Sequence, residues 1–170
     1  MPLIISYEEV HRLFEYRDGK LYWKETIGRR VPVGHEAGRA HYITGRRSVG
    51  IRGKKYPNHR IIFLMHHGYM PEQIDHIDND CTNNRIENLR AATHAQNMAN
   101  RGMFNNNRSG HKGVSWNKNA QKWCARIGID GKSIHLGLFD LISDAAAAVI
   151  DARNDYHKEF ANHAKYHAGR

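Results

Sequence analysis

The sequence has few cysteines and no long apolar run near its start. Its two cysteines, Cys81 and Cys124, lack the paired CxxC spacing of a metal site, so we expect neither a disulfide framework nor a structural zinc site. The apolar stretch at residues 3–5 is far too short for a signal peptide or a membrane span. We therefore expect a cytoplasmic protein with no membrane partner.

Acidic residues are also scarce, with 17 Asp and Glu against 26 Lys and Arg, and the sequence pI is about 9.7. A pI above roughly 9 is typical of nucleic-acid-binding domains. The basic excess is concentrated in two arms, residues 29–60 and 108–132, whereas residues 75–107 hold three basic and four acidic residues. Solvated charged faces would explain scattered basic residues but not this division. The division favours two basic segments that bind phosphates, on either side of a segment that can hold a cation.

A carboxylate, an imidazole and two amides are spaced along that centre, at Asp75, His76, Asn88 and Asn97. Hydrolysis of a phosphodiester requires a base that deprotonates water and a cation that neutralises the phosphate. His76 can be the base, because an imidazole titrates at roughly 6.5 and is largely neutral in the cell. Carboxylate and amide oxygens suit a hard cation such as magnesium better than zinc.

Local signals predict the secondary structure around these residues. Residues 72–90 are predicted to form two short strands around an Asn-rich turn. Because side chains alternate along a strand, Asp75 and His76 point to opposite faces, and both can border one cleft only at the end of the strand. Thr93 and Gln96 form a capping box that begins a helix running to about residue 101 and carrying Asn97. The predicted unit is strand, loop, strand, helix.

This unit resembles the ββα-metal motif of HNH nucleases, in the His-Asn-Asn variant of phage and intron-encoded homing endonucleases. The resemblance implies that His76 is the general base, that Asp75 and Asn97 bind Mg²⁺, and that Asn88 braces the loop and orients His76. Mn²⁺ or another divalent cation can substitute for Mg²⁺. The third signature position, often His in the family, is Asn97 here, a substitution that occurs within the family.

Neighbouring polar residues have simpler interpretations. Asp and Asn often bond their own backbone in tight turns, which is the role we expect for Asp78, Asp80, Asn83 and Asn84. His94 lies one turn before Asn97 and can touch a phosphate, but a solvated residue at the helix start is the better interpretation.

The C-terminal arm has a pattern of its own. Alternation over residues 122–127 and a glycine turn at residues 130–131 predict antiparallel strands, and Ser143 can cap a following alanine-rich helix. This pattern resembles the three-stranded sheet plus helix of plant ethylene-response-factor DNA-binding domains, which also occur fused to HNH nucleases. There the exposed face of the sheet lies in the major groove. The matching candidates here are Lys112, Trp116, Lys118, Lys122, Trp123, Arg126 and Lys132.

Two details of that arm stay open. Trp123 is as well explained by a core position under the helix as by a DNA contact, whereas Trp116 favours DNA. Ser115 and Asn117 stand where plant domains carry more arginine, so no target sequence follows.

The first seventy residues predict a helix at 7–16, a strand at 20–24, a hairpin of residues 47–51 and 54–56, and a helix that carries Ile61, Ile62, Leu64 and Met65. This arrangement resembles the region that precedes the metal motif in phage HNH proteins. Further DNA-binding candidates are Arg52, Lys54, Lys55, His59, Arg60 and Arg85.

These observations predict an α+β protein with a ββα-metal nuclease core and an N-terminal α/β extension in residues 1–104, the motif itself covering about 72–101. A sheet-plus-helix domain follows in residues 105–170, with a linker at 97–110. We expect a magnesium-dependent DNA endonuclease of the homing type in a bacterial host cell, with double-stranded DNA as its partner and no small-molecule substrate. A monomer has one active site and would nick. The alternatives are a non-cleaving DNA-binding regulator and a ribonuclease or RNA-binding protein.

Overall fold

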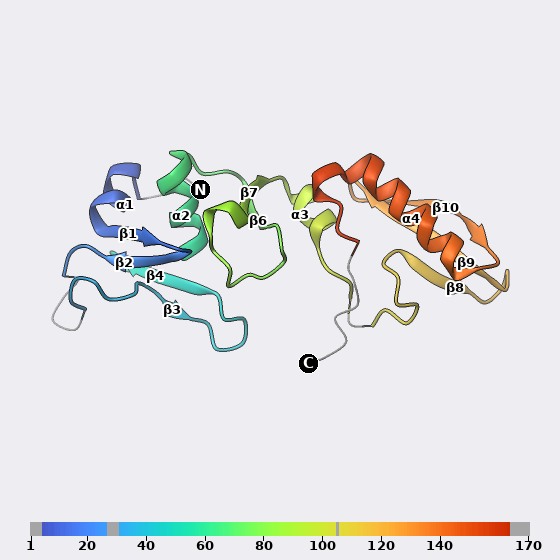
Figure 1. Cartoon of the computed structure of the whole chain (residues 1–170), viewed down its shortest axis with the longest axis horizontal. Helices are drawn as coiled ribbons and strands as arrows, with labels where there is room; N and C mark the ends of the chain where they lie inside the picture. The colour runs from blue at the N-terminus through green and yellow to red at the C-terminus, as the bar shows by residue number, and fades with distance from the viewer. Residues whose placement is uncertain (1–4, 27–30, 105, 164–170) are drawn as a thin grey trace. The chain divides into compact units, whose positions relative to one another are not determined.

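The computed structural model describes residues 5–26, 31–104 and 106–163, which fold into two compact units, Met1–Ala92 and Thr93–Arg170. The fold is α+β with small antiparallel sheets, as predicted (Figure 1). The predicted domain division after residue 104 lies twelve residues further along the chain than the division between the compact units. Within the described ranges, no helix is both long and apolar enough to cross a membrane.

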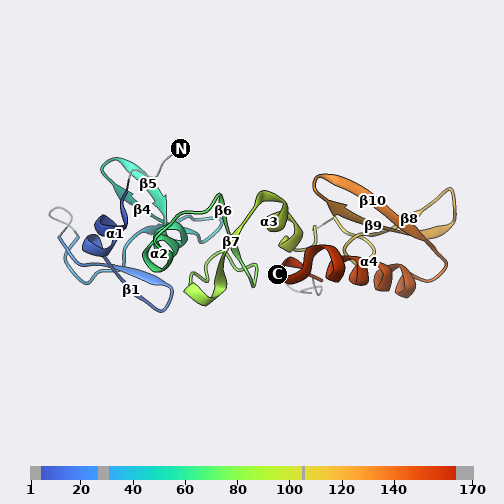
Figure 2. The ribbon, with the colours of Figure 1, turned by 90° about the horizontal axis from the view of Figure 1, so that it is seen from above.

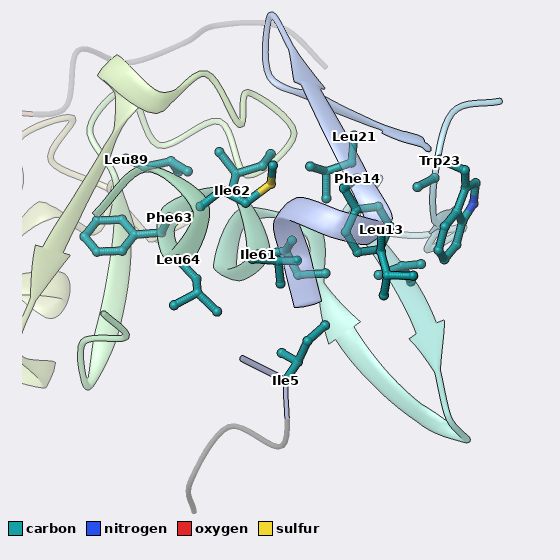
Figure 3. Close-up of a cluster of buried hydrophobic side chains, with 14 of the residues drawn as sticks. Ile5, Leu13, Phe14, Leu21, Trp23, Ile61, Ile62, Phe63, Leu64 and Leu89 are labelled. Atoms are coloured by element: carbon teal, nitrogen blue, oxygen red, sulfur yellow. The ribbon is translucent and has the colours of Figure 1, made fainter. Parts of the chain in front are cut away.

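The first unit is built around one buried helix, α2 (Asn58–His67). Its consecutive residues Ile61 to Met65 are all buried, which places the helix at the centre of the unit rather than on its surface. Figure 3 shows this core, with Leu13 and Phe14 among the side chains that surround the helix. The other elements of the unit are α1 (Tyr7–Leu13), β1 (Phe14–Arg17), β2 (Lys20–Trp23), β3 (Arg39–Ala40), β4 (Arg47–Ile51), β5 (Lys54–Pro57), β6 (Gln73–His76), a 3-10 turn η1 (Ile86–Asn88) and β7 (Leu89–Ala92).

Most of the predicted elements of this unit are present. The hairpin of β4 and β5 is confirmed, and β6 pairs with β7 in an antiparallel ladder. The helix predicted at residues 7–16 instead ends at Leu13, because Phe14 turns into an extended conformation and begins β1. In β1 the Phe14 ring packs against Trp23 with 4.6 Å between ring centroids, so burial of two aromatic rings outweighs one more helical turn.

The second unit consists of a sheet ordered β10-β9-β8 with the helix α4 packed along one face (Figures 1 and 2). Ala145, Ala146 and Val149 of α4 pack against Val114 and Ala125 of the sheet, and their small side chains let helix and sheet approach closely. The elements are α3 (His94–Asn100), β8 (Val114–Asn117), β9 (Lys122–Ile129), β10 (Lys132–Phe139), α4 (Ile142–His157) and η2 (Lys158–Phe160).

Two predictions for this unit need correction. Helix α4 begins after Leu141 without a side-chain cap, and Ser143 lies inside the first turn, where its hydroxyl bonds the Asp144 carboxylate. The segment predicted as a linker from residue 97 is helical up to Asn100, and α3 is held within the second unit. Arg153 donates to the Ala99 carbonyl at 3.2 Å, and Asn162 donates to the Asn100 carbonyl at 2.8 Å.

Candidate active site

Asp75 and His76 occupy the end of β6, where the ladder pairs Asp75 with Arg90 and His76 with Leu89. Both residues are buried, at 4% and 8% exposure. Arg90 reaches Asp75 through Nε and a terminal nitrogen, each 2.8 Å from Oδ2. Both contacts end on the same carboxylate oxygen.

The imidazole of His76 is held by an amide that sequence reasoning assigned to the turn. His76 Nε2 lies 2.9 Å from Asn84 Oδ1, and Asn84 is itself 5% exposed. An amide oxygen only accepts, so Nε2 is the donor in this bond. No feature of the sequence separates Asn84 from Asn83, because the two adjacent residues belong to one Asn-rich turn.

A second imidazole packs on the first. The rings of His59 and His76 meet edge to face, 5.3 Å apart at an interplanar angle of 64°. Burial lowers the pKa of His59 to about 3, with smaller contributions from His76, Arg46 and Arg60. At neutral pH His59 therefore carries no positive charge, and its contact with a phosphate stays a prediction.

Asn88 is the last residue of the loop between β6 and β7. Its Oδ1 accepts from the Asp78 backbone N–H at 3.1 Å, and its Nδ2 donates to Asp78 Oδ1 at 2.9 Å and to the Asn83 carbonyl at 2.8 Å. Asp80 closes the same loop by accepting from the Thr82 backbone and hydroxyl. Asn88 thus ties the two ends of the loop together.

Asn97 lies on α3, in the second unit. The capping box predicted for this helix is confirmed, with Thr93 accepting from the Gln96 backbone and Gln96 accepting from that of Thr93. The Asn97 side chain is half-buried, and its joint action with Asp75 stays a prediction.

The donor set can be tested for its fit to a metal. Among the described residues, no group of three His, Cys, Asp or Glu side chains is placed to hold an ion. The two predicted ligands, a carboxylate and an amide, are hard oxygen donors by residue type. Mg²⁺ prefers oxygen ligands and keeps several waters, so these residue types suit it better than zinc, and their joint binding of an ion stays a prediction.

The predicted DNA contacts of the first unit fall into two groups. Arg52 and Arg85 are engaged by acids, with Arg52 2.6 Å from Glu9 and Arg85 2.8 Å from Asp18. Lys54 and Lys55 are exposed on β5, and Arg60 is half-buried on α2.

The sheet of the second unit presents one polar face. Val114 and Ala125 point to α4, so by alternation Ser115, Asn117, Lys122 and Arg126 share the opposite face, where Arg126 pairs with His135 of β10. An open depression of about 310 Å³ on this face is lined by Ser115, Trp116, Asn117, Lys118, Asn119, Cys124 and Arg126.

The two tryptophans of this sheet lie differently. Trp123 packs against the small core under α4. This is the core position that the sequence left open for it. Trp116 is 44% exposed and meets Trp123 edge to face at 5.1 Å. Lys132 and Lys118 are exposed near the strand ends.

Lys112 has a structural partner. Its ammonium donates to the carbonyls of Ala99 and Arg101 at the end of α3, while burial, with the charges of Arg153 and Arg101, lowers the Lys112 pKa to about 7. We expect Lys112→Met to destabilise the protein by about 1–3 kcal/mol, because two helix-end carbonyls lose their donor. Urea unfolding measures this change.

Lys118→Met is the matched control, because Lys118 is exposed. It should leave stability unchanged. It should also lower the salt slope of DNA binding, which is the slope of the logarithm of the binding constant against the logarithm of the salt concentration, by about one unit. A Lys112→Met variant that kept its stability but lost salt slope would instead make Lys112 a phosphate contact.

A family model and a phage protein are similar to this chain. Residues 56–99 match the family model described as HNH endonuclease. The chain is also 34% identical over 88 residues to Protein 3.8 of Escherichia phage T7, a match that covers 52% of this chain and 72% of the phage protein. No solved structure matches the chain.

Proposed function

Because the chain belongs to the family that includes phage T7 Protein 3.8 and carries an HNH endonuclease domain, we propose that it is a metal-dependent endonuclease that hydrolyses DNA phosphodiester bonds. The observation that carries the proposal is the hydrogen bond from His76 Nε2 to the buried Asn84 amide oxygen, at 2.9 Å. With Nε2 donating to Asn84, we assign Nδ1 as the nitrogen that takes the proton of water.

The proposed mechanism assigns each residue a task. His76 Nδ1 takes the proton of the attacking water, and Asn84 holds the imidazole in the required tautomer and orientation. Asn88 keeps the loop that carries Asn84 closed against β6. Asp75 and Asn97 would hold a Mg²⁺ ion, which when bound neutralises charge on the phosphate and the leaving oxygen.

The experiment that tests this proposal is cleavage of supercoiled plasmid with magnesium and with chelator, scored separately for nicked and linear product. Nicked product that requires the metal is expected, because one active site cuts one strand. An RNA substrate and an RNA competitor test the ribonuclease alternative. A well-folded protein that binds DNA and never cleaves it would make the chain a DNA-binding regulator.

We further propose that the polar face of the second unit's sheet reads DNA, as its resemblance to ethylene-response-factor domains implies, and gives the nuclease the site preference of a homing-type enzyme. Arg126 supports this role, because it is exposed on the face opposite α4. Arg and Lys side chains presented by a β-sheet can reach base edges in the major groove.

For Arg126→Ala we expect a loss of roughly 1–3 kcal/mol at one base position of the preferred site, because a lost bidentate contact removes discrimination there. Binding titrations against a set of single-base variants of the mapped site measure it. Arg108→Ala, which removes an exposed arginine before β8, should weaken all sequences alike. If Arg126→Ala instead weakened binding to every sequence equally, base reading by Arg126 would be excluded.

A further inference from the structure

The turn between β3 and β4, residues 41–46, presents two large apolar side chains to solvent. Tyr42 is 90% exposed and Ile43 is 71% exposed. Single exposed apolar residues are ordinary on protein surfaces. An aromatic and a branched aliphatic side chain side by side at the tip of a hairpin form a small apolar projection of the kind that marks an interaction site.

The turn is held in shape by its own hydrogen bonds. His41 N–H donates to the Arg46 carbonyl and Gly45 N–H donates to the His41 carbonyl, each at 2.8 Å. Thr44 N–H donates to the His41 ring at 3.4 Å, and the His41 ring stacks on Tyr42 at 5.2 Å. The apolar tip therefore projects from a constrained turn, and binding would not have to order it first.

The same turn abuts the loop of the candidate active site. The Cys81 thiol donates to the Thr44 carbonyl at 3.4 Å. A Cβ on Gly45, whose φ is +69°, would lie 2.9 Å from Thr82 Cγ2, so the two loops are in direct contact. Arg46 is also close enough to help lower the pKa of His59, which packs on His76.

The charges around the tip indicate the kind of partner. Arg39 lies on β3 opposite Ser48, close to the turn, whereas the exposed Lys54 and Lys55 lie on β5 opposite Ile51 and Gly50, at the far end of the same sheet. Arg47 is bound within the unit, by Glu36 at 3.2 Å and by the Gly38 carbonyl at 2.9 Å. Arg46 is the last residue of the turn. An apolar tip with the exposed Arg39 and Arg46 at its base suits a polymer with an anionic backbone and an apolar stacked interior, which is duplex DNA.

We infer that Tyr42 and Ile43 form a wedge that enters a base step of duplex DNA beside the scissile phosphate, with Arg46 against the backbone. Apolar side chains inserted between base pairs unstack them and kink the duplex, and the bend brings more of the backbone onto the protein. The inference rests on the proposed function, since it takes the neighbouring site to be where DNA is cut.

The test uses the full chain, chelator to prevent cleavage, and fluorescent duplexes that carry 2-aminopurine at successive positions of the bound site. Wild type should raise the 2-aminopurine fluorescence at one step, because that base loses its stacking. Tyr42→Ala with Ile43→Ser should abolish the rise and weaken binding about 5-fold to 150-fold, the range expected for loss of a base–aromatic contact. Tyr42→Phe should keep both.

Tyr156→Ala, which removes another exposed tyrosine from α4, is the matched control and should bind and distort DNA as wild type does. Unfolding curves check that all variants are folded, as expected for exposed positions. Wedge variants that bind normally and keep the fluorescence rise would overturn the inference. Loss of binding to anionic phospholipid vesicles, with DNA binding unchanged, would overturn it in favour of a membrane.

The same measurements keep the inference separate from the proposed function. A wild type that cleaves plasmid without distorting the duplex would leave the nuclease standing and remove the wedge. A wild type that distorts the duplex through Tyr42 but never cleaves it would remove the nuclease and leave the wedge standing.

Discussion

Replacement of His76 by alanine is expected to lower the rate of DNA cleavage by about 10²–10⁴-fold, the usual contribution of a general base. The loss should be large because Asn84 holds His76 Nε2, which prepares Nδ1 to take a proton. His59 cannot substitute for it, since a ring whose pKa burial lowers to about 3 is a weak base. Single-turnover cleavage of supercoiled plasmid at saturating enzyme and magnesium measures the change.

The matched control is His35→Ala, which removes an exposed histidine of the same unit and should cleave at the wild-type rate. DNA binding by His76→Ala should match wild type in the presence of chelator, which separates a lost base from a lost fold. Cleavage by His76→Ala at the wild-type rate would show that another group deprotonates the water.

Asp75→Asn is expected to have two effects, a loss of stability and a loss of cleavage. Asp75 is 5% exposed in its side chain and pairs with Arg90, so an amide in its place removes this counter-charge from a half-buried guanidinium. Breaking a buried ion pair from one side typically costs about 3–5 kcal/mol. Cleavage should be abolished because the proposed metal site loses its anionic ligand. Urea unfolding and plasmid cleavage, at a temperature where the variant is folded, measure the two effects.

Arg90→Met separates these effects, because it breaks the same ion pair and leaves the Asp75 carboxylate in place. We expect a similar loss of stability, with metal-dependent cleavage retained by the folded fraction. If both variants lose cleavage equally at equal folded fraction, Asp75 serves the fold and a different group binds the metal.

The secondary structure of the motif was predictable because its signals are local. The Thr93 capping box, the β4–β5 hairpin and the strand–loop–strand–helix order each depend on residues close in sequence. The helix predicted through residue 16 was wrong beyond Leu13, since helical periodicity cannot show that Phe14 pairs with Trp23 in a hairpin.

The partners of individual polar atoms were not predictable in the same way. Asn83 and Asn84 are adjacent and of one residue type, yet Asn83 donates to Asp78 in the turn and Asn84 is buried against His76. Lys112 has the charge of a phosphate contact but lies on the carbonyls that end α3. Charge and residue type alone do not show which side of a loop faces inward.

The sequence by itself determined the basic character of the chain, the order of its elements and the residue types of a nuclease motif, because composition and near-neighbour patterns carry that information. Only the tertiary structure decided that Asn84 holds His76, that Arg90 neutralises Asp75 and that the Tyr42 turn lies against the loop at Thr82. These contacts depend on how loops and strands pack onto the core around α2, and packing joins residues that no local pattern connects.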